Sequence, residues 1–314
     1  MWYSADREAR AVTMPLRISI TVSGLSALFG RDLSEVVAAA HLADEVGIHQ
    51  IALPDHLAMG ARTDRYPYGR FPLPREEPWL EPLTALAAIA GATRRIRLAT
   101  GVLIAPLRPP LLLAKTVATL DVLSDGRVDL GVGVGWQREE FDAGGVPFEG
   151  RWRRLDDTLR ACRALWHDAP ASFRSDTVSF DDVVCLPRPA QRGGIPLWLG
   201  LAASESHLTR MVEFGAGWMP MTADPAALGR DVRRIRQALQ AAGRDPASFG
   251  VRVSVPGVAD GAGRIDLDRT LASLPALAEA GATHLGFALG RFVREPEHLR
   301  PFLERLGKLA QTGR

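Results

Sequence analysis

Strand-like and helical patterns alternate eight times along this chain of 314 residues. Each short apolar run, rich in β-branched residues, is followed by a stretch with apolar residues at helical spacing. Because parallel strands need a crossover helix between them, this alternation predicts an α/β fold with a parallel sheet. Eight such units favour a (β/α)8 TIM barrel over an open doubly wound sheet. The predicted strands are 16–22, 48–53, 96–104, 127–132, 196–199, 217–220, 249–255 and 284–287.

Helices are expected at 32–46, 82–92, 109–123, 152–166, 205–214, 225–242, 267–280 and 297–309. Residues 14–314 are therefore expected to form a single barrel domain, preceded by an extension at 1–13.

Three stretches do not fit the repeat, and we interpret them as loop insertions. Residues 57–81 and 136–150 follow strands, so they are expected at the C-terminal face of the barrel, where active sites lie. Residues 169–194 follow a helix and begin at the opposite face, but this stretch is long enough to cross over. Long loops of this kind are usually functional or disordered.

Composition excludes several classes of protein. The chain has 38 basic and 36 acidic residues, a formal charge of +2, whereas a nucleic-acid-binding protein more often shows a basic surplus. No apolar run is long enough to span a membrane, and the first ten residues do not have the pattern of a signal peptide. Cys162 and Cys185 are too few for a disulfide scaffold or a zinc site. A cytoplasmic protein without a metal site is expected, and no His/Asp/Glu cluster has ligand spacing.

Glycines alternate at the end of the predicted fourth strand, at Gly131, Gly133 and Gly135. They do not form a dinucleotide-binding loop, because Trp136 occupies the position of the third glycine in Gly-x-Gly-x-x-Gly. Small residues at a strand end let a ligand approach closely, and a flat ring would suit that space. Residues 119–127 connect a helix to the start of this strand, so they are expected to stabilise the bottom face.

His56 follows the second predicted strand, in the sequence Pro54-Asp55-His56, and is the one histidine expected at a strand's C-terminal end. An imidazole beside a carboxylate exchanges protons near neutral pH. The other interpretation is structural, with Asp55 capping a turn and His56 bonding a backbone carbonyl. The residues leave both open.

Gly200 and Ser204 follow the fifth strand at a predicted helix start. A helix N-terminus binds phosphate, but a serine there is more often a plain N-cap.

These residues carry a resemblance to the bacterial luciferase-like superfamily of flavin- and deazaflavin-dependent enzymes, over roughly residues 16–243. The matching segments are Asp55-His56, IRLATGV at 96–102, ATLDVLSDGR at 118–127 and GVGVGW at 131–136, extended by EEF at 139–141 and GVPF at 145–148. The run YPYGRFPLP at 66–74 is similar to actinobacterial members that use coenzyme F420.

The resemblance implies a TIM barrel that binds its cofactor ring over the C-terminal mouth. It implies a cis peptide bond at Gly101–Val102, and a proton-transfer role for His56 with Asp55 tuning it. It also implies a homodimer acting on a small-molecule substrate. The cofactor-binding residues would be Gly101, Val102, Gly133, Gly135, Gly200 and Ser204, and Tyr66, Tyr68, Trp79 and Trp136 would line the substrate pocket.

Two positions depart from the family's pattern. Trp136 replaces the catalytic Glu of the sugar-phosphate dehydrogenases, and Gly200-Leu201 replaces a Gly-Gly pair after the fifth strand. The leading hypothesis is hydride transfer between coenzyme F420 and a small organic substrate. The alternatives are an FMN-dependent monooxygenase that uses reduced flavin and O2, and a non-catalytic cofactor- or ligand-binding barrel.

Overall fold

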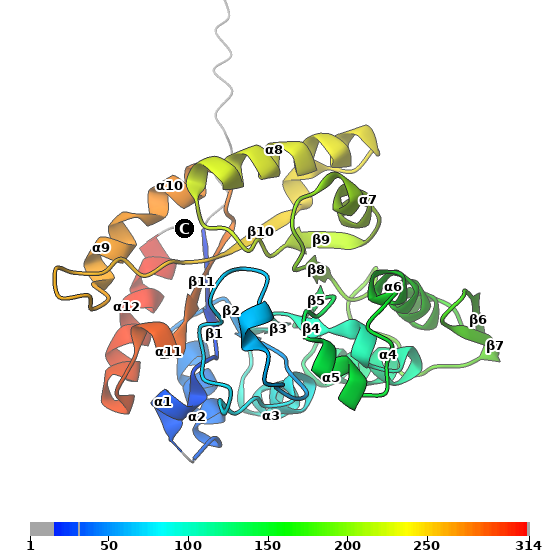
Figure 1. The fold of residues 1–314 in the computed structure, drawn as a ribbon, viewed down its shortest axis with the longest axis horizontal. Helices are drawn as coiled ribbons and strands as arrows, with labels where there is room; N and C mark the ends of the chain where they lie inside the picture. Colours follow the sequence, from blue (N-terminus) through cyan, green and yellow to red (C-terminus); the bar gives the residue numbers. More distant parts are fainter. Residues whose placement is uncertain (1–15, 31, 313–314) are drawn as a thin grey trace, which may run out of the picture.

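A closed ring of parallel strands forms the centre of the computed structural model, which describes residues 16–30 and 32–312 (Figure 1). The ring closes where β3 pairs with β5, so the fold is a (β/α)8 TIM barrel. In ring order the strands are β1 (Arg17–Thr21), β2 (Gln50–Leu53), β3 (Arg97–Thr100) with β4 (Leu103–Ile104), β5 (Val128–Gly133), β8 (Leu197–Leu199), β9 (Gly215–Trp218), β10 (Gly250–Ser254) and β11 (His284–Ala288).

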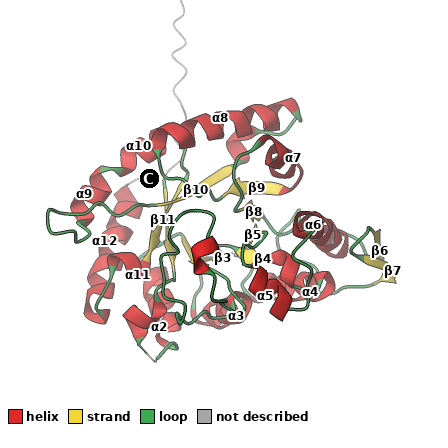
Figure 2. Ribbon diagram, viewed as in Figure 1, coloured by secondary structure: helices red, strands yellow, loops and turns green. Residues whose placement is uncertain are grey.

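Helices surround the strands on the outside of the ring (Figure 2). The helix α8 shows why they pack there, because Leu228, Val232, Ile235 and Leu239 recur on one face and are buried. The helices are α1 (Leu25–Phe29), α2 (Glu35–Glu45), α3 (Pro82–Ala92), α4 (Pro110–Leu123), α5 (Arg138–Ala143), α6 (Arg151–His167), α7 (Glu205–Phe214), α8 (Pro225–Ala241), α9 (Leu267–Ala272), α10 (Leu274–Glu279), α11 (Leu289–Phe292) and α12 (Leu299–Thr312).

The predicted alternation of strands and helices is confirmed, with two interruptions. The third strand, expected as one run over 96–104, is broken into β3 and β4 around the Gly101–Val102 peptide bond. That bond is cis, as the family resemblance implies. The helix expected over 267–280 is broken at Ser273, because Pro275 has no N–H for a bond to the preceding turn. The extension expected at 1–13 lies outside the described residues.

The third insertion stays at the bottom of the barrel. Its first part forms the antiparallel hairpin of β6 (Ala171–Arg174) and β7 (Ser179–Val183), which projects from the barrel in Figure 1. Further on, the Gln191 backbone N–H donates to Asp121 Oδ2 at 3.0 Å, and its side-chain amide donates to Asp121 Oδ1 at 2.8 Å. These bonds hold residues 169–194 beside the turn before β5, so the insertion does not cross to the mouth. Asp121 thus has the bottom-face structural role expected of it.

Polar side chains form a connected layer inside the barrel. Ser19 Oγ donates to Gln50 Oε1 at 3.1 Å, and Gln50 Nε2 donates to Asp129 Oδ2 at 2.8 Å. Arg97 binds both oxygens of Asp129, at 2.8 and 2.7 Å. Each of these four side chains therefore has a hydrogen-bond partner among the others.

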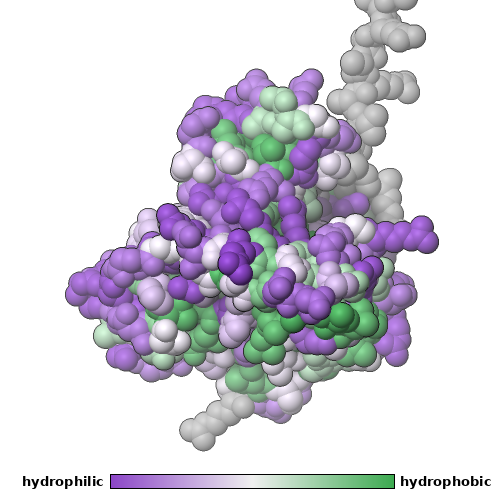
Figure 3. All heavy atoms as spheres, turned by 90° about the vertical axis from the view of Figure 1, so that its right-hand side faces the viewer, coloured by the Kyte–Doolittle hydropathy of each residue, from purple (hydrophilic) through white to green (hydrophobic). Residues whose placement is uncertain are grey.

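Several apolar side chains remain exposed on α4 and after the hairpin. Leu112 and Leu123 of α4 are 59% and 70% exposed, and Val184 is 62% exposed. Figure 3, which views the side of the hairpin, shows hydrophobic residues gathered in patches among hydrophilic ones. The homodimer implied by the family resemblance stays a prediction. Within the part of the chain that the structure describes, every helix is too short or too polar to cross a lipid bilayer.

His284 makes the stability of the barrel sensitive to acid. The ring is buried beside Trp198, and burial, with the neighbouring His49, lowers the pKa of His284 to about 2. The unfolded chain takes up a proton below about pH 6.5, whereas the folded chain does not. The free energy of unfolding therefore falls as the pH falls below this value, by about 1.4 kcal/mol per pH unit for this group.

We predict that His284→Asn makes this pH dependence shallower by about 1.4 kcal/mol per unit between about pH 4 and 6. Urea unfolding at several pH values measures the slope. The exposed His298 is the matched control, and His298→Asn is expected to keep the wild-type slope. Equal slopes in wild type and His284→Asn would show that His284 is not the source of this pH dependence.

Candidate functional site

A cavity of about 950 Å³ opens at the C-terminal mouth of the barrel. This volume is at the upper end of the range for small-molecule sites, large enough for a cofactor ring and a substrate together. Its wall contains eleven of the twelve predicted site residues, namely Asp55, His56, Tyr66, Tyr68, Trp79, Gly101, Val102, Gly133, Gly135, Trp136 and Gly200.

Ser204 is the predicted site residue that the structure does not bring to the cavity. It precedes α7 without a side-chain capping bond, and its hydroxyl lies 3.1 Å from Ser206 Oγ. A phosphate contact from this serine, as expected from the sequence, therefore has no support in the geometry.

His56 is held by a buried carboxylate that the sequence analysis did not identify. Its Nδ1 lies 3.0 Å from Glu140 Oε2, and the other oxygen of Glu140 accepts the Leu57 N–H at 2.6 Å. Glu140 belongs to α5 and is only 2% exposed. With Nδ1–H donating to this carboxylate, a neutral His56 carries its lone pair on Nε2. The arrangement is that of an oriented acid or base.

The Asp55 carboxylate makes its hydrogen bonds to groups other than His56, so the geometry gives no support to the prediction that it tunes His56. This carboxylate accepts the Ile104 N–H at 2.8 Å and pairs with both terminal nitrogens of Arg108, one of them at 2.8 Å. Burial opposes the charge on Arg108, but the bonds to Asp55 raise the pKa of Arg108 above its ordinary value. The guanidinium matches the carboxylate in shape and charge, so Asp55 serves to fix the segment after the third strand.

Aromatic rings enclose His56 from the two loops at the mouth. The ring centroid of Trp79 lies 4.8 Å from that of His56, and the centroid of Trp136 lies 6.0 Å away. Tyr66 packs edge-on against Trp136 at 5.3 Å. Phe71, which the sequence analysis did not single out, joins the same cluster at 6.2 Å from His56. Burial raises the pKa of Tyr66, so its hydroxyl stays protonated at neutral pH.

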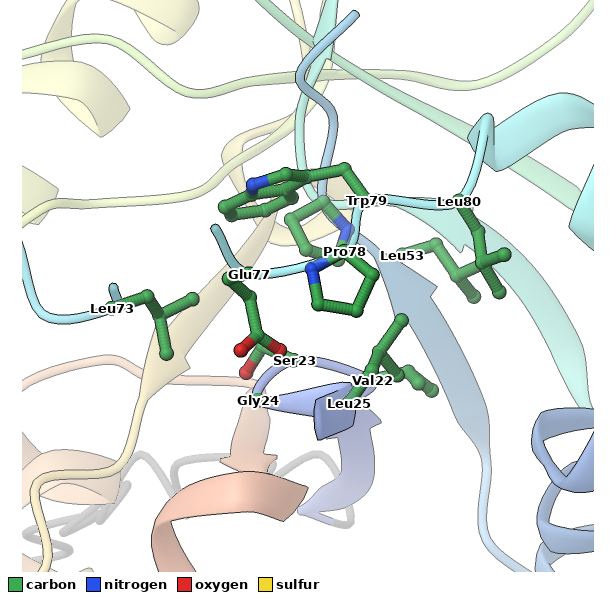
Figure 4. Close-up of a pocket in the computed structure, with 11 residues that line it drawn as sticks. Val22, Ser23, Gly24, Leu25, Leu53, Leu73, Glu77, Pro78, Trp79 and Leu80 are labelled. Carbon is green, nitrogen blue, oxygen red and sulfur yellow. The ribbon is translucent and has the colours of Figure 1, made fainter. Parts of the chain in front are cut away.

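The loop that carries Trp79 is fastened to the start of α1. Glu77, 5% exposed, accepts hydrogen bonds from the Ser26 backbone N–H at 3.2 Å and from the Ser26 hydroxyl. Figure 4 shows the Glu77 carboxylate turned toward the Ser23–Gly24 turn, with the Trp79 ring on the other side of Pro78. The aromatic wall is thus attached to the barrel next to His56.

Val102 lies among glycines in the wall of the cavity. A Cβ on Gly133 would lie 2.7 Å from Val102 Cγ2, and one on Gly200 would lie 2.7 Å from Val102 Cγ1. These glycines therefore make room for the valine first, and the valine and the backbone present a flat surface to a ligand. That the glycines shape a ring site stays a prediction.

Arginine side chains gather at the cavity. Arg151 begins α6 with its guanidinium 3.8 Å from the centre of the Phe148 ring, and beside it Trp152 stacks on His207 at 4.4 Å. His207, which the sequence analysis did not single out, lines the cavity. The cationic residues of the wall, within the described chain, are Arg65, Arg151, Arg252, Arg291 and Arg294. Over residues 16–30 and 32–312, no three His, Cys, Asp or Glu side chains are grouped to hold a metal ion.

The comparison with protein families agrees with the fold. Residues 14–268 match the model described as luciferase-like monooxygenase. The chain therefore belongs to the luciferase-like monooxygenase family, whose members are oxidoreductases.

Relatives and solved structures show the breadth of this family. An uncharacterised protein of Mycobacterium tuberculosis is 34% identical over 278 residues, which are 87% of this chain and 93% of that protein. The pyrimidine monooxygenase RutA of Cronobacter sakazakii is 29% identical over 183 residues, 54% of this chain and 51% of RutA.

Two solved structures share the fold. An F420-dependent secondary alcohol dehydrogenase, in complex with an F420-acetone adduct, superposes with a TM-score of 0.74 at 17% identity, covering 95% of this chain and 99% of that one. The monooxygenase RslO1 of Streptomyces bottropensis superposes with a TM-score of 0.73 at 22% identity and the same coverage.

Removing Arg108 should leave the buried carboxylate of Asp55 without its counter-charge. The Asp55 side chain is fully buried, so we predict that Arg108→Met lowers the free energy of unfolding by about 3 kcal/mol. Urea unfolding measures the loss. The double variant Asp55→Asn/Arg108→Met should recover part of it. Arg62→Met, which breaks an exposed pair with Asp64, should leave the free energy of unfolding nearly unchanged, because solvent screens exposed ion pairs. Equal effects of the two single substitutions would contradict a stabilising role for the buried Asp55–Arg108 pair.

The packing of Val102 against Gly200 yields a prediction for ligand binding. Gly200→Ala should displace the valine and weaken cofactor binding at least about tenfold, because overpacking shifts neighbouring groups. Gly91→Ala is the control, since a Cβ there meets nothing within 4 Å. Fluorescence titration with the cofactor measures the affinity of both variants. Wild-type affinity in Gly200→Ala would contradict the proposed surface.

Proposed function

We propose that this chain is an oxidoreductase that transfers a hydride between coenzyme F420 and a small organic substrate. The observation that carries the proposal is the His56–Glu140 pair, which faces a large cavity lined by aromatic rings and by Val102 with its neighbouring glycines. Coenzyme F420, when bound, supplies the hydride chemistry, so the protein has to bind, orient and manage one proton.

The residues present fit a deazaflavin or flavin ring. Val102 and the glycine backbone around it offer one flat face, and Trp136 and Tyr66 offer aromatic surface in the same cavity. Both cofactors carry a phosphate on the tail, and Arg151 supplies a cation at the start of α6, where the helix dipole also favours an anion. Gly101, Val102, Gly133, Gly135 and Gly200 are the residues proposed to shape the ring site.

His56 is proposed to hold or release the proton that accompanies hydride transfer. When a carbonyl compound is reduced to an alcohol, the oxygen must gain a proton, and His56 Nε2 is the atom that supplies it. Glu140 keeps the ring in one orientation through the hydrogen bond between its carboxylate and His56 Nδ1. The surrounding Trp79, Phe71 and Trp136 rings keep water away from that proton.

A second candidate is an FMN-dependent monooxygenase that uses reduced flavin and O2, supported by the similarity to RutA. A deazaflavin reacts poorly with oxygen, so the identity of the cofactor decides the reaction. The motif at 66–74, which is similar to actinobacterial F420-dependent members, favours F420. Titrating the protein with F420 and with FMN under the same conditions tests this choice. We expect tighter binding of F420, and tight FMN binding without F420 affinity would overturn it.

His56→Gln tests the proposed proton transfer. We predict that it lowers the oxidation rate of reduced F420 with a panel of ketones and aldehydes by about 10²- to 10⁴-fold, with cofactor affinity unchanged. His41→Gln changes an exposed histidine on α2 and should keep the wild-type rate. If a wild-type enzyme that turns over one of these substrates keeps its rate after His56→Gln, His56 is not the acid. Absence of turnover with intact cofactor binding is what the non-catalytic hypothesis expects.

A further inference from the structure

Arg252 is a cation in the barrel interior that also forms part of the cavity wall. It lies on β10 and is only 4% exposed. Its Nε donates to Ser19 Oγ at 3.0 Å, and its Nη2 donates to Thr21 Oγ1 at 2.7 Å. Both partners are neutral hydroxyls of β1. The hydrogen bonds given by Nη1 remain available, since none goes to a residue that the structure describes.

No carboxylate of the described chain pairs with Arg252. Asp129, in the same polar layer, already binds Arg97 through both oxygens and accepts from Gln50. Burial lowers the pKa of Arg252 to about 10, so the guanidinium still carries its charge at neutral pH. Asp129 stabilises this charge without bonding to it. A buried cation without a bonded carboxylate is still costly, whereas an anion entering the cavity would complete its coordination.

The backbone is shaped to accept this guanidinium. Gly286 on the neighbouring strand β11 faces it, and a Cβ there would lie 2.9 Å from Arg252 Nη2. Every larger residue at this position would press on the planar group. The arginine therefore occupies a prepared place at the floor of the mouth.

The cavity has two chemically different sides. Gly101, Gly133 and Gly200 come from the third, fourth and fifth strands of the ring, with Val102 between them. Arg252 and Ser254 come from β10, across the barrel from that strip and beside β11. A ring bound on the glycine side leaves the arginine side to a second molecule.

The charges of the wall also favour an anion. Among the described residues that line the cavity, Asp55 is the only acid, and Arg108 neutralises it. Arg252 is the deeply buried cation, whereas Arg291 and Arg294 are exposed. Because a cofactor tail leads from its ring toward solvent, it would meet exposed or partly buried arginines such as Arg151. The deep arginine is left for a group that is held inside the mouth.

We propose that Arg252 binds a carboxylate of the substrate through its free Nη1 edge, and that the substrate of this oxidoreductase is a small organic acid. This inference rests on the proposed function for the identity of the second molecule, but the anion site itself is independent of the cofactor. The charge pair would place the acid in the mouth that it shares with His56.

Binding of benzoate and of its neutral isostere benzamide tests the proposal, because the two probes differ in charge and hardly in shape. Isothermal titration is carried out on the full chain, with and without saturating F420. We expect benzoate to bind wild type at least about tenfold tighter than benzamide, in keeping with a charge-assisted hydrogen bond. Arg252→Met should remove that difference and leave the affinity for F420 unchanged. Arg252→Lys should keep part of it.

Arg294→Met is the control for a non-specific effect of positive charge, since it removes an exposed cation of the same cavity. It should keep most of the benzoate preference. The thermal midpoint of Arg252→Met reports folding, and it should equal or exceed that of wild type because an unpaired buried charge has gone.

Equal affinity of wild type for benzoate and benzamide would overturn the proposal, as would a benzoate preference that survives Arg252→Met. Loss of F420 affinity in Arg252→Met would assign the arginine to the cofactor and overturn it too. A benzoate preference that depends on Arg252 in a protein that does not bind F420 would support the anion site and reject the proposed function. The two failures are therefore distinguishable.

Discussion

Closure of the parallel sheet at the third strand is the constraint on which the mouth of this barrel depends. β3 pairs with β2 and with β5, and β4 continues the pairing with β5. Between them the strand turns through Gly101 and Val102, and the carboxylate of Asp55 holds the Ile104 N–H on the far side. This hydrogen bond is stable because Arg108 neutralises the buried carboxylate of Asp55. Without it, the strip around Val102 would have no fixed position.

The site contains two buried charged side chains, Glu140 and Arg252, which differ in their hydrogen-bond partners. Glu140 is matched to His56 and to the backbone N–H of Leu57, so its charge is stabilised by groups of the protein itself. Arg252 has only hydroxyl partners in the described chain, and its charge is left for a ligand. A protein can hold such a group because the rest of the barrel is well packed. The contrast separates a group set up for proton transfer from one set up for binding.

Sequence periodicity predicted most of the fold, because local patterns of apolar residues determine the alternation of strands and helices. It placed His56, Trp79 and Trp136 at one mouth, since the C-terminal ends of parallel strands converge there. It did not reveal the partners of these groups. Glu140 lies 84 positions from His56 in the chain, and no local pattern distinguishes a buried glutamate on α5 from the adjacent Glu139. The one signal was the EEF segment of the family resemblance.

Contacts between residues that are distant in the sequence also explain where the sequence expectations and the structure differ. Adjacent residues in a chain, such as Asp55 and His56, point in different directions at a strand end, so proximity in sequence did not make them a pair. Arg252 was overlooked because an arginine in an apolar strand looks like a surface position unless its strand is known to face the barrel interior. For the third insertion, length allowed a crossing to the mouth, but the bonds of Gln191 to Asp121 decided its course.

The proposed ring site is tested most directly by a crystal structure of the chain with bound F420. We expect the deazaflavin ring to pack against Val102 and the surrounding glycines, with its free face open to His56 and the Arg252 side of the cavity. A ring that instead lies over Arg252, or that binds away from the mouth of the barrel, would contradict it.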